Sequence, residues 1–283
     1  MKSFIRTDLA CEREGDLRRR ELTVQGCRVC EVRERRDREW VSFATVHFSS
    51  LGEIRAEEFA RVGRAVTTLL EGMARQAVPS PRCVLVACLG NPRVTSDSLG
   101  PCVAHSLEVT RHVQLLDAHA FSGFGKGTLC LVTPGVLGDT GIEAAELVRA
   151  AVRELGADLV VAVDALCAVG SAHLGAAVQI CDHGLRPGSG LGNRRMAIDK
   201  ERMGCPVISI GVPTVIDSAT LICDALCRAG ICGVGRELAD HLTRAKRNFV
   251  APCDVDVVVR RGGTLLAQVI GECFGVGSGN FCL

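Results

Sequence analysis

The chain has 283 residues, of which 47% are hydrophobic and only 4% aromatic, and its formal net charge is +1 at pH 7. A nearly neutral chain gives no electrostatic reason to expect direct binding to nucleic acid or to an acidic membrane. It contains no apolar run of the roughly 20 residues that a membrane span needs, and its first residues lack the apolar core of a secretory signal. We therefore expect a cytoplasmic protein without a membrane segment, with a core built mostly from aliphatic residues.

The 16 cysteines predict neither a disulfide framework nor a zinc site. Many lie inside apolar runs, where a thiol behaves as a small hydrophobic side chain, and no export signal supports disulfides. Cys27 and Cys30 form one CxxC without a second pair, and Cys223, Cys227 and Cys232 share one helical segment and the turn after it. Neither spacing supplies the four ligands of a structural zinc site.

The first 80 residues are expected to be charged additions to the core that follows. Residues 1–40 mix acidic and basic side chains, which is typical of a solvated surface and not of a polyanion site. Residues 22–24 and 41–48 alternate apolar and polar side chains and predict a hairpin or a pair of edge strands. Residues 54–75 have apolar side chains at helical spacing and predict an amphipathic helix.

From residue 83 onward, short apolar runs alternate with helical segments. The runs predict buried strands at 84–89, 128–133, 158–163, 176–181 and 206–210. Helices are expected after Asp97, over 142–155 and after Asp217. Strands and helices that alternate in this way predict an α/β fold with a mostly parallel sheet and helices on both faces.

Two aspartates stand where predicted strands end. Asp97 lies in a polar turn after the strand at 84–89, and Asp164 directly follows the apolar run 159–163. The carboxyl ends of neighbouring parallel strands meet at one edge of a sheet, so we expect the two carboxyl groups to lie close together. Two carboxylates that share a site raise the pKa of one of them. The pair then offers an acid and a base near neutral pH, which suits attack of water on an amide.

Structural explanations compete with this interpretation. Asp97 could instead cap the helix that follows it, because a short side-chain oxygen accepts hydrogen bonds from the free amides of a first turn. The structural alternative is weaker for Asp164, since an unpaired carboxylate after five apolar residues is costly to bury. His105 and His112 could join the two aspartates around a metal ion, although such histidines more often pack or cap a helix.

The Gly-rich stretch 185–193 resembles a phosphate-binding loop only superficially. It lacks the Lys-Ser/Thr ending of a P-loop and does not open a helix as GxGxxG does after a strand. We interpret it as a loop whose backbone amides line a peptide groove. Ser189 has no evident histidine partner nearby in the sequence and no GxSxG motif surrounds it, so a serine nucleophile is disfavoured.

Seven longer motifs follow one another along most of the chain. They are RTDLACE at 6–12, LGNPRVTSDSLGP at 89–101, VTRH at 109–112, PGVLGDTGIEAAELV at 134–148, ADLVVAVDAL at 157–166, QICDHGLRPGSGLGN at 179–193 and PVISIGVPTVIDSATL at 206–221. In these motifs the chain resembles the germination proteases of spore-forming bacteria, endopeptidases that degrade the small acid-soluble proteins coating spore DNA. Pro92, Arg93 and Ser96 depart from the usual residues around the first aspartate of that family.

The resemblance implies a hydrogenase-maturation-protease-like, three-layer α/β/α core with Asp97 and Asp164 as the essential catalytic pair. We expect neither a cofactor nor a metal. It also implies a zymogen that trims its own N-terminus. We accordingly expect residues 1–9 to be a propeptide and 10–283 a single peptidase domain, with the cut in Thr7–Ala10, between Asp8 and Leu9. The family is commonly tetrameric, so a homotetramer in the spore core is expected, acting on small acid-soluble spore proteins.

The function expected from these observations is an atypical aspartic endopeptidase that begins the degradation of spore proteins during germination. One aspartate would be ionised and activate water, while the other, protonated, would polarise the scissile carbonyl. Two alternatives stay open. The same acids could be ligands in a metal-dependent, maturation-type endopeptidase, or the chain could bind spore proteins without cutting them.

Overall fold

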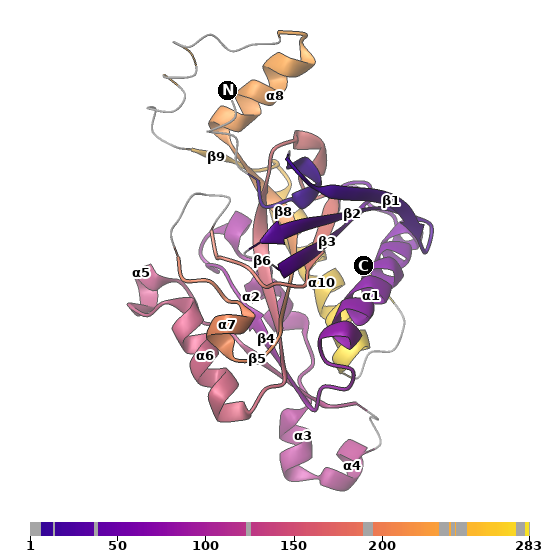
Figure 1. Cartoon of the computed structure of the whole chain (residues 1–283), viewed down its shortest axis with the longest axis vertical. Helices are drawn as coiled ribbons and strands as arrows, with labels where there is room; N and C mark the ends of the chain where they lie inside the picture. Colours follow the sequence, from indigo (N-terminus) through magenta and orange to yellow (C-terminus); the bar gives the residue numbers. More distant parts are fainter. Residues whose placement is uncertain are drawn as a thin grey trace.

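The computed structural model describes residues 7–13, 15–36, 39–122, 126–188, 195–231, 238, 241, 248–275 and 281–282. These residues form one sheet in the strand order β1-β2-β3-β7-β8-β6-β4-β5, with β9 paired to β8 (Figure 1). The strands are β1 Arg18–Val24, β2 Cys27–Arg36, β3 Glu39–His47, β4 Cys83–Cys88, β5 Thr128–Val132, β6 Leu159–Ala168, β7 Ala177–Cys181, β8 Val207–Asp217 and β9 Phe249–Val250. The helices are α1 Ala56–Ala77, α2 Leu99–Ser106, α3 Arg111–Leu116, α4 Ala118–Ser122, α5 Leu137–Thr140, α6 Ala144–Leu155, α7 Lys200–Met203, α8 Ser218–Arg228 and α10 Val255–Phe274.

The centre of the sheet is parallel. Strands β5, β4, β6 and β8 pair side by side in the same direction. Strands β1, β2, β3 and β7 extend the sheet beyond β8 as an antiparallel wing. Helices cover both faces, with α6 and α7 on the left of the sheet in Figure 1 and α1 and α10 on the right. The predicted α/β class, with a parallel core between two helical layers, is confirmed.

Alternate residues of the central strands point into two different cores. Val86, Val163 and Ile210 pack into the larger core under α1, α2 and α10. Leu85 and Val160 pack into a smaller core under α6 and α7. This alternation follows from the period of two in a β-strand. It also means that a polar residue in one of these strands faces only one of the two helical layers.

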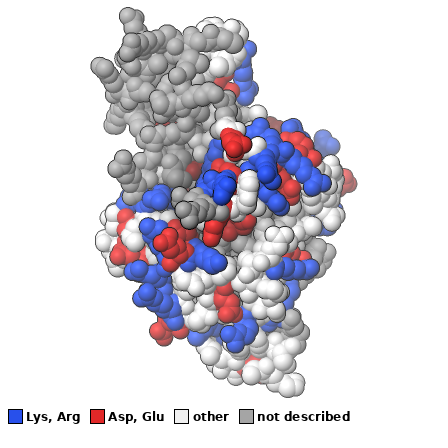
Figure 2. All heavy atoms as spheres, in the orientation of Figure 1, with Lys and Arg blue, Asp and Glu red and all other residues white. Residues whose placement is uncertain are grey.

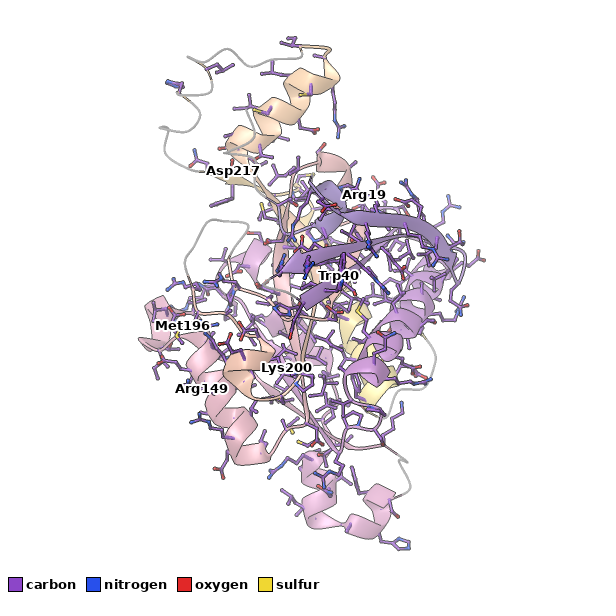
Figure 3. All side chains as sticks on the ribbon, in the orientation of Figure 1. Arg19, Trp40, Arg149, Met196, Lys200 and Asp217 are labelled. Carbon is purple, nitrogen blue, oxygen red and sulfur yellow. The ribbon has the colours of Figure 1, made fainter. Side chains whose placement is uncertain are left out.

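The antiparallel wing differs from its prediction in one strand. The sequence predicted that 22–24 would pair with 41–48, but β2 lies between β1 and β3 and pairs with both. Strand β2 buries apolar side chains on both faces, with Val29 in the larger core and Val32 in a smaller one, and its charged side chains are likewise on both faces, so it shows no simple alternation. Acidic and basic side chains intermingle over this wing in Figure 2, and Arg19 of β1 and Trp40 of β3 are labelled in Figure 3.

The second half of the chain follows the expected order with longer strands. Strand β8 runs through to Asp217, whose side chain caps α8 by accepting from the Thr220 amide (Figure 3). Gly156 ends α6 with a φ of 61° in the left-handed conformation, as its position predicted. The sequence did not reveal α10, which is buried against α1 and α2. No helix in the described ranges is both long and apolar enough to cross a membrane.

Candidate active site

Asp164 lies where strand β4 ends beside β6. The ladder between the two strands extends to Cys88 and Val163, and Asp164 is the next residue of β6. The expectation that Asp164 ends its own strand is wrong, because pairing with β8 carries β6 on to Ala168. Asp164 therefore lies in extended backbone, one residue beyond the last residue of β6 that pairs with β4.

A tight turn after β4 brings Asp97 back toward this point. Gly90 has a φ of +118°, and the Asn91 amide donates to the Asp97 carboxylate at 3.0 Å and to the Asp97 carbonyl at 2.9 Å. A Cβ atom on Gly90 would lie 2.0 Å from the Asp97 carbonyl oxygen, so only glycine permits this approach. The capping explanation for Asp97 is wrong. Helix α2 starts after Ser98 and has no side-chain cap.

The two aspartates line one cavity of about 130 Å³. Leu89, Gly90 and Ala144 contribute to its wall, as do Glu143 and Arg195, which form an ion pair at 3.7 Å. Glu143 also begins α6 through a capping box with Glu146. The cavity has room for a few water molecules, because each occupies about 30 Å³ in the liquid.

The environment of the pair raises the pKa of both carboxyl groups. For Asp164, which is 8% exposed, burial is the largest cause, and the negative charges of Asp97 and Asp8 raise its pKa further. For Asp97, burial again raises the pKa, while the hydrogen bond from the Asn91 amide opposes the change. Asp164 is thus the group that more readily keeps a proton at neutral pH.

Asp164 also lines a second, larger cavity of about 610 Å³. Gln179, Ser209 and Gly211 contribute to this cavity from β7 and β8, and Arg186 from the loop after β7. The described part of the Gly-rich stretch reaches both cavities, with Leu185 on the larger and Pro187 and Gly188 on the smaller. Ser189 lies outside the described residues.

Thr7, Asp8 and Arg13 form part of the wall of this larger cavity. The Asp8 amide donates to the Cys167 carbonyl at 2.8 Å, and the Cys167 amide donates to the Asp8 carboxylate at 2.9 Å. Leu9 is fully buried against Ala168 and Ile216. The chain that carries the expected cleavage site is therefore bound next to Asp164.

Glu12 anchors the same segment at its other end. Its carboxylate accepts hydrogen bonds from the amides of Val169 and Gly170 at 2.7 and 2.9 Å, and it lies 2.6 Å from Nδ1 of His173. Burial alone would raise the pKa of Glu12, but the hydrogen bonds from His173, Thr7 and the two amides outweigh it and lower the pKa. The segment is thus held at both Asp8 and Glu12.

Residues 16–261 match the family model described as germination protease. The chain belongs to the germination protease family. Among relatives that bear this name, one from Caldanaerobacter subterraneus is 36% identical over 239 residues, covering 78% of this chain and 72% of the relative. One from Bacillus cereus is 33% identical over 250 residues, covering 80% and 66%. One from Clostridium perfringens is 41% identical over 165 residues, covering 58% and 50%, so the chain spans about half the length of some of the curated relatives it matches.

Among solved structures, a NiFe hydrogenase maturation protease from Thermococcus kodakarensis is similar in fold. It is 18% identical to this chain and covers 71% of it, while 98% of the other chain is matched, with a TM-score of 0.36.

In this member of the germination protease family, the structure does not bring the predicted histidines to the aspartates. His105 and His112 are exposed on α2 and α3, and neither lines a cavity that Asp97 or Asp164 lines. Cys27 and Cys30 point to opposite faces of β2, into different cores. No group of three potential ligands among His, Cys, Asp and Glu occurs in the described part of the chain, and Cys232 lies outside it.

Sequence reasoning missed three polar residues of the site. Gln179 is 6% exposed within the apolar strand β7, and a buried amide in such a strand was the signal that could have identified it. Arg13 was hidden in a charged region, and Arg195 follows a glycine-rich loop, so neither stood out from its surroundings. All three reach the site only because segments that are far apart in the sequence fold next to one another.

Proposed function

We propose that this chain is an endopeptidase of atypical aspartic type, with Asp97 and Asp164 as its acid–base pair. The observation that carries the proposal is the cavity lined by both aspartates, where burial raises the pKa of each and the charge of Asp97 further raises that of Asp164. Membership of the germination protease family supports the same reaction class. A pair that shares one proton offers a base and an acid at neutral pH.

In the proposed mechanism, Asp97 acts as the base. It is the less buried of the two and already accepts a hydrogen bond from the Asn91 amide, which favours its ionised form. It takes a proton from a water molecule in the shared cavity, and the water oxygen bonds to the scissile carbonyl carbon. Asp164 starts protonated, polarises the carbonyl, and gives its proton to the departing amine when the carbon–nitrogen bond breaks. Proton transfer between the two carboxyl groups then restores the starting state.

We further propose that the chain processes itself between Asp8 and Leu9. This is supported by Thr7 and Asp8 lining the same cavity as Asp164, with the Asp8 amide hydrogen-bonded to the Cys167 carbonyl of β6. A cut there releases residues 1–8, one residue fewer than the expected propeptide 1–9, and residues 1–6 lie outside the described residues. Substrates would follow the same path once this segment has been cut.

The natural substrates proposed for the chain are small acid-soluble spore proteins, cut at the start of germination in the cytoplasm of the spore core. A homotetramer is proposed as the working assembly. These proposals rest on the germination protease family and on the relatives that carry its name.

The experiment is digestion of a purified small acid-soluble spore protein by the wild-type chain and by Asp164→Asn, with fragments identified by mass spectrometry. Asp256→Asn serves as the matched control, because Asp256 is exposed on α10. Discrete cuts by the wild type and the control, but not by Asp164→Asn, are expected. Equal cutting by Asp164→Asn would remove this residue from the mechanism.

Two further results would favour the alternatives. Loss of cutting on dialysis against a chelator, restored by a divalent ion, would favour a metal-dependent endopeptidase that uses the same acids as ligands. Binding of the spore protein with no cutting by any variant would favour a binding protein.

A further inference from the structure

We propose that Gln179 is a further catalytic residue, whose side-chain amide stabilises the oxyanion that forms on the scissile carbonyl, and that Arg13 supplies a second donor during self-processing. The inference rests on the proposed endopeptidase function and on cleavage between Asp8 and Leu9. It is carried by the position of Gln179 in the sheet and by its hydrogen bonds to the bound segment.

Gln179 lies in the same row of the sheet as Asp164. Gly211 of β8 pairs with Asp164 of β6 on one side and with Gln179 of β7 on the other. Paired residues of neighbouring strands point to the same face, so both side chains project from one face with a glycine between them. Two strand spacings of about 4.8 Å separate β6 from β7, so the backbones of Asp164 and Gln179 lie about 10 Å apart.

Gly211 lets the Asp164 backbone and the Leu166 side chain pack closely against β8. A Cβ atom at this position would lie 2.3 Å from the Asp164 carbonyl oxygen and 2.8 Å from Cγ of Leu166. Asp8, Asp164, Gln179 and Gly211 all line the larger cavity. The peptide bond that would be cut therefore borders the same cavity as Asp164 and Gln179.

The side-chain amide of Gln179 contacts the backbone on both sides of Leu9. Its Nε2 donates to the Asp8 carbonyl oxygen at 2.9 Å, and its Oε1 accepts from the Ala10 amide at 2.6 Å. The Ala10 amide can only donate, so it fixes which end of the Gln179 side chain faces Asp8. The Asp8 carbonyl is the one that would be attacked in the proposed cut, so Gln179 already donates to the oxygen that would become negative.

Arg13 donates to the same oxygen. Its Nη2 lies 3.1 Å from the Asp8 carbonyl, while its Nη1 pairs with both carboxylate oxygens of Glu34 at 3.1 and 3.3 Å. Its guanidinium group also lies over the Phe43 ring, 5.0 Å from the centroid. Two fixed donors at about 3 Å from one carbonyl oxygen are the arrangement that stabilises a developing oxyanion.

A purely structural role for Gln179 makes a different prediction. Within the described residues, its side chain bonds to Asp8, Ala10 and, at 3.5 Å, to the Thr45 hydroxyl group. If these bonds only tether residues 7–13, then changing Gln179 would affect binding of this segment and leave turnover of a separate peptide intact. An oxyanion donor would instead affect kcat.

The experiment uses the full chain and a synthetic peptide of residues 3–13 as substrate, with kcat and KM measured separately and self-cleavage followed by mass spectrometry. Gln179→Met removes the donor at nearly constant shape, and Thr45→Val is the control because Thr45 contacts Gln179 but not Asp8. We expect kcat to fall about 10²–10³-fold in Gln179→Met, as when other oxyanion donors are removed. Thr45→Val should keep kcat within roughly threefold of wild type.

Gln179→Glu adds a signature that a tether would not produce. Its carboxyl group can donate only while protonated, so its kcat should fall more steeply with rising pH than that of the wild type. This variant also covers the case in which Gln179→Met fails to fold.

The possible outcomes distinguish failure of the oxyanion role of Gln179 from failure of the proposed endopeptidase function. If the wild type cuts, Asp164→Asn does not, and Gln179→Met and Gln179→Glu keep wild-type kcat, then the oxyanion role is wrong and the endopeptidase stands. A rise in KM with unchanged kcat also overturns the inference and makes Gln179 a tether. If the wild type cuts neither the peptide nor itself, the proposed function fails and the inference fails with it.

Discussion

The two faces of the sheet differ most next to the point where strand β4 ends. On the face under α1, α2 and α10, Val163, Ile210 and Ile180 lie in a closed apolar core. On the opposite face, their direct neighbours in sequence form the row Asp164, Gly211 and Gln179, which lines the larger cavity. The two rows belong to the same three strands and are offset by one residue.

Because of this offset, the residues that stabilise the fold and the residues proposed for catalysis lie on opposite faces of the sheet. Successive side chains in a strand point to opposite faces, so one strand can hold the core together with one residue and present a reactive group with the next. We therefore expect substitutions in the polar row to change activity with little loss of stability. Substitutions in the apolar row should do the reverse.

The largest expected effect is the loss of activity in Asp97→Asn and Asp164→Asn. Each substitution removes one member of the acid–base pair, so cleavage should fall by about 10²–10⁴-fold. Both variants should unfold at a temperature no lower than the wild type at neutral pH, since a neutral amide is cheaper to bury than a carboxylate. Peptide cleavage and thermal unfolding measure the two quantities. Inactive variants that had also lost their fold would contradict the separation of the two rows.

The matching change in the apolar row is Ile180→Ala, next to Gln179. Ile180 is fully buried, so the free energy of unfolding should fall by about 2–5 kcal/mol, as for other buried isoleucines. The kcat of the folded variant should stay close to that of the wild type. Denaturant unfolding and peptide cleavage test this, with Ile222→Ala as control, because Ile222 is 43% exposed. A large fall in kcat at intact stability would show that the two rows are not independent.

Gly211→Ala should affect both properties. Its added Cβ would press on the Asp164 carbonyl and on Leu166, which we expect to lower the free energy of unfolding by about 1–3 kcal/mol. It would also displace Asp164 and reduce cleavage. Gly72→Ala is the control, since no atom lies within 4 Å of a Cβ there, and should stabilise helix α1 by about 0.4–1 kcal/mol. An active and fully stable Gly211→Ala would contradict the close contact between this position and the Asp164 carbonyl oxygen.

The smallest effect concerns pH. Burial, followed by the charges of Asp97 and Asp8, raises the pKa of Asp164 in the folded state above its value in the unfolded chain. Between these two pKa values the folded state binds more protons, so its stability should fall as pH rises, by at most about 1.4 kcal/mol per pH unit. Denaturant unfolding at a series of pH values should show this fall in the wild type and a shallower one in Asp164→Asn. Identical slopes would mean that Asp164 titrates normally.

Much of the fold could be predicted from local patterns. The apolar runs at 84–89 and 128–133 became β4 and β5, and the helical spacing over 54–75 became most of α1. These elements depend on the periodicity of a few consecutive side chains, which is visible in a single sequence. Strand β2 and helix α10 were missed. Apolar and charged side chains are mixed on both faces of β2, and α10 is buried on several sides, so neither shows a clear period in the sequence.

The candidate site could be predicted only in part. The placement of Asp97 and Asp164 after buried strands was enough to expect them together, and they line one cavity. Gln179 could not be linked to them, because strand β7 is inserted between β3 and β8 and runs antiparallel to both. Its register against Gly211 depends on contacts between segments far apart in the sequence.

The sequence by itself determined which residues alternate, which turns need glycine, and which acids follow the central strands, because these properties arise between near neighbours in the chain. Tertiary structure decided that Asp164, Gly211 and Gln179 form one row and that the backbone of Asp8 and Ala10 is hydrogen-bonded to Gln179 of that row. The physical reason is that strand order and register are set by the packing of both faces of the sheet at once. A shift of one residue would exchange the core and the site.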